Sequence, residues 1–333
     1  MEENPRRALL RLVSGYQLSQ ALHVAARLDI ADRLAAGARS TDELAAETKT
    51  HADALYRLLR ALAAVGVLHE LDDRRFELTD LGEGLRSGVP DSVHGWALMI
   101  GRPMHWNTWS SLVESIRTGE NTFRLVHGTD VWSYRAERPE EQAIFDGAMT
   151  SVTGLLDAAV LDAYDLARFR CVVDVAGGRG ALLASILARH ETIRGVLFDQ
   201  PAVVANAGAL LDRFGERCSV VGGSFFESVP SGADAYLLKA ILHDWEDAEC
   251  VAILRVIREG MPEDAVVLVL ERDLGGPNEN PPAKFSDLNM LVNPGGRERS
   301  EEEYAALFDT GGLRYIGVTP STAGFSVFEA SRV

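Results

Sequence analysis

The sequence predicts an α/β protein in which a helical, winged-helix region precedes a doubly wound, mostly parallel sheet. Apolar residues recur at helical spacing through the first half, which also holds one short hairpin pattern. From residue 171 onward, short apolar runs of strand length alternate with helical segments. Strands that alternate with helices are typical of a parallel sheet covered on both faces. We therefore expect three regions, at residues 1–90, 91–165 and 166–333.

The first region has the element order of a winged helix. Residues 8–36 have helical spacing, and Ser40 precedes an acid-rich first turn as a helix cap. A longer amphipathic helix is predicted over residues 55–65. The short runs 67–70 and 75–78 then flank a polar turn and predict a hairpin.

The remaining chain divides into helices and then alternating elements. Residues 91–165 predict further helices, one of them carrying Trp106, Trp109, Leu112 and Ile116, and another carrying Phe145 and Met149. Strands are predicted at residues 171–175, 195–198, 219–221, 235–240 and 265–270. Helices are predicted between them at residues 181–189, 202–213 and 248–261.

The charge balance excludes polyanionic partners. The chain has 49 acidic and 33 basic residues, and its net charge is −16. A protein this acidic repels nucleic acid and anionic membranes, so neither is an expected partner. The winged-helix region alone holds 12 basic and 14 acidic residues, whereas a DNA-reading domain carries a basic stripe. We expect this region to be structural or dimerising.

Cysteine usage and hydropathy indicate a cytoplasmic protein. The three cysteines, Cys171, Cys218 and Cys250, form no C-x-x-C pair and indicate neither a disulfide framework nor structural zinc. The first residues lack the apolar segment of a signal peptide. No stretch approaches the roughly 18 uninterrupted apolar residues of a membrane span.

A glycine-containing loop follows the first predicted strand. The dinucleotide pattern G-x-G-x-x-G fits Gly178 and Gly180, but Leu183 occupies the third glycine position. An acidic residue followed by spaced glycines, as in S-adenosylmethionine enzymes, fits Asp174, Gly178 and Gly180, with Ala176 in place of the first glycine. An acid near the loop suits a sulfonium cation better than a pyrophosphate. A glycine turn without a ligand is the plainer alternative.

Two further residues follow predicted strands. Asp199 lies after the second strand, where a carboxylate accepts hydrogen bonds from ribose hydroxyls of either cofactor, although a helix-capping role is also open. His243 follows the fourth strand and stands where a general base would act, although a lone histidine is more often structural.

Five ordered motifs resemble one enzyme family. They are the Asp174–Gly180 loop, Phe198-Asp199-Gln200-Pro201, Gly222-Gly223-Ser224-Phe225-Phe226, His243-Asp244-Trp245 and Asn293-Pro294-Gly295-Gly296-Arg297-Glu298-Arg299. Together they resemble the small-molecule O-methyltransferases that include the plant caffeate and flavonoid enzymes, and especially the bacterial natural-product branch. The resemblance covers essentially the whole chain. It implies a Rossmann-like class I methyltransferase domain behind a winged-helix domain that forms a homodimer.

The resemblance implies a catalytic group of three residues. His243 matches the family's general base, and Glu271 and Glu298 match the carboxylates that flank and orient it. A phenol with a pKa of about 10 is mostly protonated at neutral pH, so a positioned base raises the phenolate fraction. From the sequence alone, both glutamates read as ordinary surface acids.

The cofactor implied is S-adenosyl-L-methionine, with S-adenosyl-L-homocysteine as product and no metal. Asp199 matches the ribose ligand, Ser224 and Phe225 the adenine contacts, and Lys239 a residue lining the adenosine pocket. Trp245 is expected near the adenine. The loop itself contributes Asp174, Ala176, Gly177 and Gly178. Two positions depart from the plant pattern: Ala176 replaces a glycine, and Ser224 replaces an acid, which weakens the expected adenine contact.

The substrate expected is a phenolic natural product of polyketide or naphthoic acid type. Candidates for holding an aromatic ring are Trp106, Phe145, Met149, Met290 and Asn293, although each fits an ordinary core position. In this family the amino-terminal arm of the partner subunit often reaches the site. We hypothesise that Arg11, on that arm with Arg6 and Arg7, binds a substrate carboxylate, while a solvated helix face remains the alternative.

Four alternatives remain at this point. A metal-dependent catechol mechanism is disfavoured because no clustered ligand set is apparent near the strand ends. A ligand-sensing transcription regulator is disfavoured by the weakly charged first region. An NAD-dependent oxidoreductase is disfavoured by Leu183. The same fold diverted to decarboxylation or hydroxylation stays open, because the family includes such members.

Overall fold

The computed structural model describes residues 4–89, 91–205 and 207–333. The chain forms two compact units: unit 1 comprises residues 1–107 and 138–152, and unit 2 comprises residues 108–137 and 153–333. The three-region division expected from the sequence stays a prediction beside this two-unit description.

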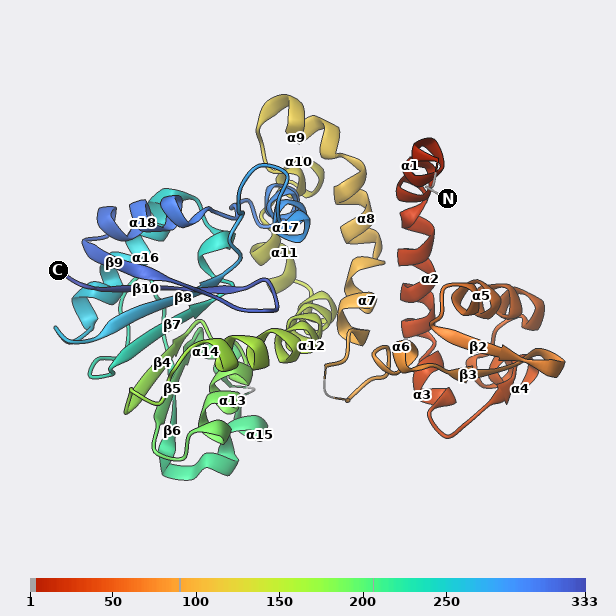
Figure 1. Cartoon of the computed structure of the whole chain (residues 1–333), viewed down its shortest axis with the longest axis horizontal. Helices are drawn as coiled ribbons and strands as arrows, with labels where there is room; N and C mark the ends of the chain where they lie inside the picture. The colour runs from red at the N-terminus through yellow and green to blue at the C-terminus, as the bar shows by residue number, and fades with distance from the viewer. Residues whose placement is uncertain (1–3, 90, 206) are drawn as a thin grey trace. The chain divides into compact units, whose positions relative to one another are not determined.

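Unit 1 begins with three helices in the region, residues 8–36, for which the sequence predicted helical structure. They are α1 (Pro5–Val13), α2 (Gly15–Arg27) and α3 (Ile30–Leu34) (Figure 1). Ser14 closes α1 by donating its backbone N–H to Leu10 O, and Asp29 interrupts the chain with a left-handed φ of 50°. A non-glycine residue in that conformation cannot continue a right-handed helix, so the region is helical as predicted but is divided at Ser14 and Asp29.

The winged-helix part of unit 1 is confirmed. Helices α4 (Thr41–Thr48) and α5 (Ala52–Ala64) precede the hairpin of β2 (Leu68–Leu71) and β3 (Arg75–Leu78), which turns through η1 (Asp72–Arg74). The short strand β1 (Arg39–Ser40) pairs with β3. Ser40 caps α4 in a reciprocal capping box with Glu43. The core between these elements includes fully buried Leu59, Leu62 and Phe76.

The rest of unit 1 is helical and packs through glycines. Its elements are α6 (Asp80–Glu83), α7 (His94–Ile100), most of α8 (Pro103–Ser110) and residues 139–152 of α12 (Pro139–Ala163). A Cβ at Gly101 would lie 2.0 Å from the ring of His23 on α2, so only glycine fits there. The helix predicted to carry both Trp106 and Ile116 is broken at Ser111, where α8 gives way to α9 (Leu112–Thr118).

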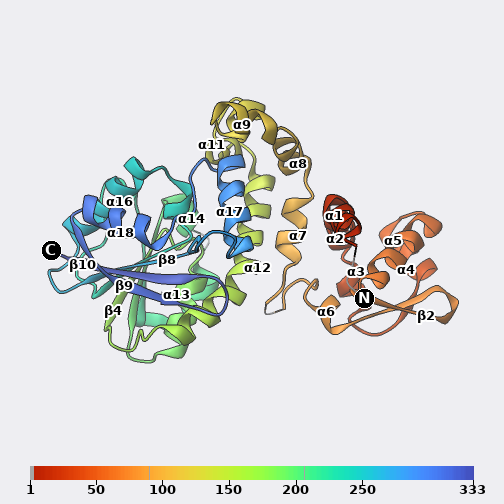
Figure 2. The ribbon, with the colours of Figure 1, turned by 45° about the horizontal axis from the view of Figure 1, so that its top comes forward.

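Unit 2 is built on one sheet (Figures 1 and 2). Its described strands lie in the order β6-β5-β4-β7-β8-β10-β9, and the first five are parallel. The parallel strands are β4 (Cys171–Val175), β5 (Arg194–Asp199), β6 (Cys218–Gly222), β7 (Ala235–Lys239) and β8 (Val266–Glu271). Each lies within a residue of its predicted bounds. The antiparallel strands β9 (Leu313–Pro320) and β10 (Ser326–Arg332) were not predicted.

Helices cover both faces of this sheet. On one face, α16 (Asp247–Gly260) and α18 (Glu301–Thr310) bury one set of alternating strand residues, including Val173 and Val267. On the other, α13 (Ala181–Arg189) and the end of α12 bury the intervening set, including Val172 and Leu268. The single helix predicted over 202–213 is divided into α14 (Pro201–Val204) and α15 (Gly208–Leu211), followed by η2 (Asp212–Arg217), and residue 206 lies outside the described part.

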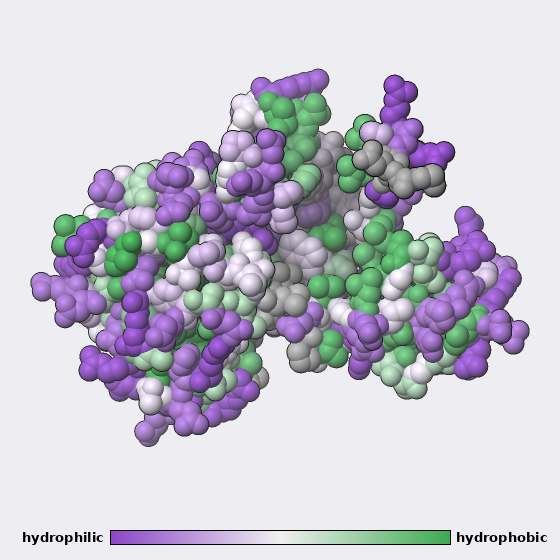
Figure 3. Space-filling model, viewed as in Figure 1, coloured by the Kyte–Doolittle hydropathy of each residue, from purple (hydrophilic) through white to green (hydrophobic). Residues whose placement is uncertain are grey.

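Unit 2 carries a further group of helices: α9, α10 (Thr122–His127), α11 (Val131–Ala136) and α17 (Pro281–Val292). The Asn121 amide at the start of α10 donates to Leu291 O and Asn293 O at the end of α17. Apolar side chains gather on the surface of α9 and α10 in Figure 3, and include Val113, Ile116, Leu125 and Val126.

Among the described residues no single helix is both long and apolar enough to cross a membrane. One bent pair of segments, 139–151 with 156–163, meets the criterion by length and composition.

Candidate active site

The carboxyl ends of the parallel strands bring most of the predicted site residues to one edge of the sheet. The glycine loop follows β4, Asp199 ends β5, Lys239 ends β7 and Glu271 ends β8. His243 lies on η3 (Leu242–Asp244), directly after β7. In open α/β sheets ligands bind at this edge.

His243 is held between two buried glutamates. Its Nδ1 lies 3.0 Å from Glu298 Oε1 and 3.3 Å from Glu271 Oε2. Its side chain is 12% exposed, whereas both glutamate side chains are fully buried. With Nδ1 oriented by carboxylates, the imidazole is held in one position and Nε2 is the nitrogen left for proton transfer.

Each glutamate is itself fixed by hydrogen bonds. Glu271 Oε1 accepts the backbone N–H groups of Ile241 (2.8 Å) and His243 (3.3 Å), which ties the end of β8 to the histidine turn. Glu298 Oε1 accepts the hydroxyl of Ser286 on α17 at 2.6 Å. Ser286 was not predicted from the sequence, because a serine on a helix carries no distinguishing pattern.

The carboxylates set the charge of the histidine. Burial lowers the pKa of His243, but Glu271, Asp244 and Glu298 outweigh it and raise the pKa to about 10. Burial raises the pKa of Glu271 to about 7, against the attraction of His243. Burial also acts to raise the pKa of Glu298, but the imidazolium lowers it overall. At neutral pH the chain alone therefore holds an imidazolium paired with the Glu298 carboxylate.

Asp244 faces the other nitrogen of the ring. Its Oδ1 lies 3.6 Å from His243 Nε2. Burial raises the pKa of Asp244 to about 6, and the charges of His243 and Arg135 act in the opposite direction. The sequence analysis noted Asp244 only as part of a motif and gave it no role.

Arg299 holds the turn that carries the histidine, and the sequence analysis missed this. The side chain is 1% exposed. Its guanidinium donates to Leu242 O at 3.0 Å and Trp245 O at 2.8 Å, at either end of η3, and to Asp247 Oδ1. The motif containing Arg299 was recognised, but only its burial identifies this arginine as structural support for the site.

Gly296 lets the loop with Glu298 lie against the same turn. A Cβ at Gly296 would lie 2.2 Å from His243 O and 2.5 Å from both Asp244 C and Trp245 N. These are backbone atoms, which cannot rotate away as a flexible side chain can. Glycine at this position is therefore required for Glu298 to reach Nδ1.

The glycine loop is tightly folded over Asp174. Ala176, Gly178 and Gly180 have φ values of 56°, 61° and 82°, in the left-handed region. Ala176, which replaces the first glycine of the loop pattern, thus adopts a left-handed conformation that favours glycine, although alanine carries a Cβ. A Cβ at Gly177 would lie 2.4 Å from Asp174 Oδ2, so the loop tolerates no side chain there. The fold provides a backbone cradle of the kind that a cofactor approaches closely.

The predicted nucleoside residues lie around this cradle. Asp199 Oδ2 accepts the backbone N–H of Gly178 at 2.8 Å and so braces the loop. Trp245 packs edge-on against Phe225 and Phe226, with ring centroids 6.0 and 5.0 Å apart. Ser224 Oγ accepts the N–H of Phe226 at 3.3 Å within the same segment. Their roles toward adenosine stay predictions.

Lys239 is paired with an acid that the sequence did not single out. Its Nζ donates to Asp157 Oδ1, on α12, at 2.5 Å, and the two side chains are 12% and 3% exposed. Burial raises the pKa of Asp174 beside them to about 7, Lys239 lowers it, and Asp157 and Asp199 raise it further. The described oxygens Asp157 Oδ2 and Asp174 Oδ2 have no hydrogen-bond partner within the structure. Buried carboxylates with unused oxygens fit a cationic ligand such as a sulfonium compound.

The predicted substrate residues are divided between the units. Arg11, Trp106, Phe145 and Met149 belong to unit 1, and Met290 and Asn293 belong to unit 2. Met290 and Asn293 are 7% and 6% exposed at the end of α17. Each assignment to substrate stays a prediction.

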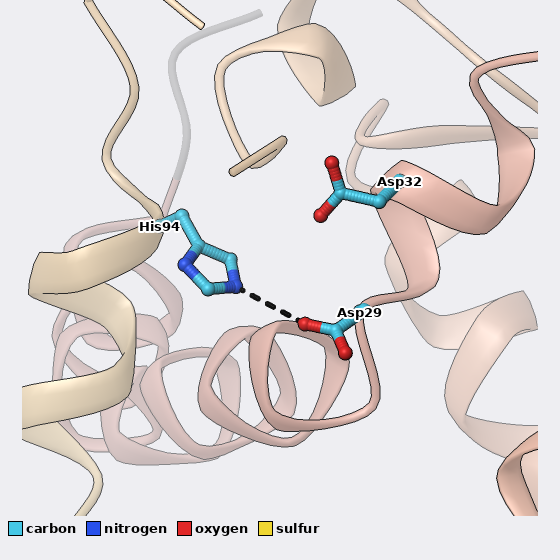
Figure 4. Close-up of side chains that lie close together, drawn as sticks. All are labelled: Asp29, Asp32 and His94. Atoms are coloured by element: carbon cyan, nitrogen blue, oxygen red, sulfur yellow. Dashed lines mark ion pairs between the residues drawn. The ribbon is translucent and has the colours of Figure 1, made fainter. Parts of the chain in front are cut away.

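Within the described residues, two groups of histidine and acid side chains are close enough to hold a metal ion. One is His243, Glu271 and Glu298, a group that includes a histidine, unlike the acid and amide set of a metal-dependent catechol mechanism, and the expectation that no metal is used stays a prediction. Tertiary folding brings together residues far apart in the chain. The other is Asp29, Asp32 and His94 in unit 1 (Figure 4).

Partners within the chain account for the unit 1 group. His94 Nε2 lies 3.2 Å from Ala26 O and 3.6 Å from Asp29 Oδ1. Asp32 accepts the backbone N–H of Ser87 at 3.1 Å, and the Asp29 side chain is 54% exposed. These contacts join the ends of helices, and we assign no ligand to them.

Comparison with known proteins identifies the family. The O-methyltransferase domain matches residues 109–314, and the O-methyltransferase dimerisation domain matches residues 10–87. The chain belongs to the O-methyltransferase family and is an S-adenosylmethionine-dependent methyltransferase of the class I fold.

Its relatives act in natural-product biosynthesis. The chain is 42% identical over 334 residues to O-demethylpuromycin-O-methyltransferase from Streptomyces alboniger, covering 98% of this chain and 89% of that protein. It is 40% identical to phenazine O-methyltransferase PhzM from Lysobacter antibioticus, covering 97% and 95%. The solved structure of LaPhzM superposes with a TM-score of 0.95 at 38% identity, covering 99% and 100%.

Two further matches bear on chemistry. NcsB1 from neocarzinostatin biosynthesis, 35% identical with a TM-score of 0.78 over 95% of this chain and 96% of that one, was solved with S-adenosyl-L-homocysteine and 1,4-dihydroxy-2-naphthoic acid. Aclacinomycin 10-hydroxylase RdmB from Streptomyces purpurascens is 34% identical, covering 98% of this chain and 90% of that protein. The family thus contains both methyltransferases and a hydroxylase at similar identity.

Gly296→Ala tests the contact between the Glu298 loop and the histidine turn. The added Cβ forces the two segments apart, and a displacement of about 1 Å at a reacting group lowers a rate by about 100-fold. We expect kcat to fall by that order. Gly317→Ala is the control, because a Cβ at Gly317 meets no atom within 4 Å. Equal kcat in the two variants would contradict the account.

Metal removal tests whether the His243 group acts as a ligand set. Because both glutamates orient the imidazole through Nδ1, we expect full methyl-transfer activity after dialysis against EDTA. Activity that disappears and returns with a divalent ion would assign the group to a metal instead.

Proposed function

We propose that the enzyme methylates a phenolic hydroxyl of an aromatic natural product of polyketide or naphthoic acid type, with His243 as general base. The observation that supports this most strongly is the oriented imidazole, with Nδ1 3.0 Å from buried Glu298. Relatives named as O-methyltransferases of phenazine, of O-demethylpuromycin and of 2,7-dihydroxy-5-methyl-1-naphthoate support an aromatic substrate.

The mechanism assigns one task to each residue of the group. When bound, S-adenosylmethionine would supply a methyl carbon that a phenolate oxygen attacks in line, so that an O–C bond forms as the C–S bond breaks and a neutral thioether leaves. His243 Nε2 removes the phenolic proton. Glu298 accepts the hydrogen bond from Nδ1–H, and Glu271, whose Oε2 lies 3.3 Å from Nδ1, adds a second negative charge; both stabilise the imidazolium that forms. Much of the rate then comes from alignment and exclusion of water.

The raised pKa of His243 requires that a nearby positive charge prepares the base. In the chain alone the carboxylates hold the ring protonated. A sulfonium placed beside the ring lowers the pKa of the imidazole, because like charges disfavour the charged form. We infer that the neutral, proton-accepting ring forms in the presence of the methyl donor.

The N-terminal region supports a homodimer. None of the described residues of α1 is buried, and Leu9, Leu12 and Val13 are 61%, 75% and 66% exposed. Exposed apolar residues on one helix mark an association surface. We propose that this surface pairs with a second copy, in agreement with the match to the dimerisation domain. Nucleic acid and membranes are not expected partners.

A diverted activity is the second candidate, because a relative is named as a hydroxylase. Mass spectrometry of a pooled phenol library separates the two. Incubation with S-adenosylmethionine should give products that gain one CH₂. His243→Ala should lower that yield by about 10²- to 10⁴-fold while S-adenosylhomocysteine still binds. Products that gain one oxygen, or unchanged methylation by His243→Ala, would overturn the proposal.

The pH dependence tests the carboxylate pair. The active imidazole is the deprotonated form, so kcat/KM for the methyl donor, which reports the ligand-free protein, should rise with pH toward the His243 pKa of about 10. Glu298→Gln removes one charge that raises this pKa, and its ascending limb should shift to lower pH by roughly one unit. The same phenol is used throughout, so its own ionisation cancels. Glu263→Gln, at an exposed position, is the control, and an unshifted Glu298→Gln profile would contradict the assignment.

Arg11 tests the reach of the partner subunit. Arg11 lies in the last turn of α1, within the proposed association surface. If it binds a substrate carboxylate across the dimer, Arg11→Ala should raise KM for an acid substrate and leave the methyl ester unaffected. Equal turnover of the acid and the ester by both the wild type and the variant would contradict the hypothesis.

A further inference from the structure

Beside the glycine loop lies a buried group of charges that the mechanism above does not use. Asp157 on α12 binds Lys239 at 2.5 Å, and Asp174, one residue before the end of β4, interacts electrostatically with both. Asp199 adds a further negative charge from the end of β5. The Lys239 ammonium thus acts on the carboxyl groups of Asp157 and Asp174, while Asp199 acts on Asp174 from the neighbouring strand on the other side.

The hydrogen bonds of this group are incomplete. Asp157 is 2% exposed and Asp174 is 1% exposed, yet Oδ2 of each has no partner among the described residues. An unsatisfied buried polar atom costs about 1–3 kcal/mol, and more when it is charged. A pair retained only to join α12 to the sheet would have no reason to leave these oxygens unused. The arrangement instead indicates a ligand that brings a hydrogen-bond donor and positive charge.

The position of the Asp157–Lys239 pair relative to the sheet indicates which end of the ligand lies beside it. Strand β4 lies between β5, which ends at Asp199, and β7, which ends at Lys239. The Asp157–Lys239 pair is therefore on the opposite side of the loop from the predicted ribose acid. It lies on the side where β7 continues to His243. A ligand with its ribose at Asp199 extends its other end toward this pair.

That other end of S-adenosylmethionine is an α-amino acid, which carries an ammonium and a carboxylate. A carboxylate with a free oxygen and an adjacent lysine form the complementary arrangement. We propose that Asp157 accepts the α-ammonium of the methyl donor and that Lys239 donates to its α-carboxylate. This inference rests on the methyl-donor assignment of the proposed function and adds Asp157, which none of the sequence motifs contains.

Binding measurements with ligands of different length test the proposal without turnover. Isothermal titration calorimetry compares S-adenosylhomocysteine with 5′-methylthioadenosine, which lacks the amino acid end. Asp157→Asn should weaken S-adenosylhomocysteine binding by about tenfold or more, the effect of losing a hydrogen bond to a charged group. Binding of 5′-methylthioadenosine should change by less than about twofold. Asp162→Asn is the matched control, because Asp162 lies on the same helix with a 68% exposed side chain.

Each other outcome overturns the proposal. Equal weakening of both ligands in Asp157→Asn would assign the residue a structural role. Weakening of S-adenosylmethionine but not S-adenosylhomocysteine would assign it to the sulfonium instead of the amino acid end. If Asp157→Asn does not fold, Asp157→Ser takes its place, with the same ratio of affinities as the readout. A wild-type chain that binds neither ligand would instead refute the proposed function.

Discussion

The contact between His243 Nδ1 and two buried carboxylates is the interaction on which the rest of the site depends. It joins three segments that are far apart in sequence: η3, the end of β8, and the loop carrying Glu298. Gly296 allows that loop to approach the turn. The Arg299 guanidinium donates hydrogen bonds to backbone carbonyl groups at both ends of the turn. Without these supports, the carboxylates would not keep the ring in one orientation.

The His243–glutamate contact is one of two places along the described part of this sheet edge where buried carboxylates are paired with a positive charge. Buried carboxylates are unfavourable unless they are paired, and here they face an imidazolium on one side and a lysine on the other. Such an edge favours a cationic ligand. We propose that a cationic ligand in turn lowers the pKa of the histidine, because like charges disfavour the charged form. The proposed function thereby couples binding of the methyl donor to deprotonation of His243 through electrostatics.

Much of this site was accessible from sequence because local patterns fix it. The five parallel strands have continuous apolar runs, whereas Glu271 and Glu298 were predicted only through the resemblance to a known family. Strands β9 and β10 were missed because no helix alternates with them. The break at Asp29 depends on one backbone conformation. Asp157 and Arg299 were missed because only tertiary burial distinguishes them from surface charges.

The most direct test of the central claim is the protonation of His243 itself. Imidazole ¹⁵N NMR of the whole chain, assigned with the His243→Ala variant, reports the ring pKa with and without ligand. The account predicts a pKa far above the ordinary value of about 6.5 in the free protein. It also predicts a lower pKa when S-adenosylmethionine is bound. The change should be smaller with S-adenosylhomocysteine, because its sulfur is uncharged. A pKa near the ordinary value that neither ligand moves would contradict it.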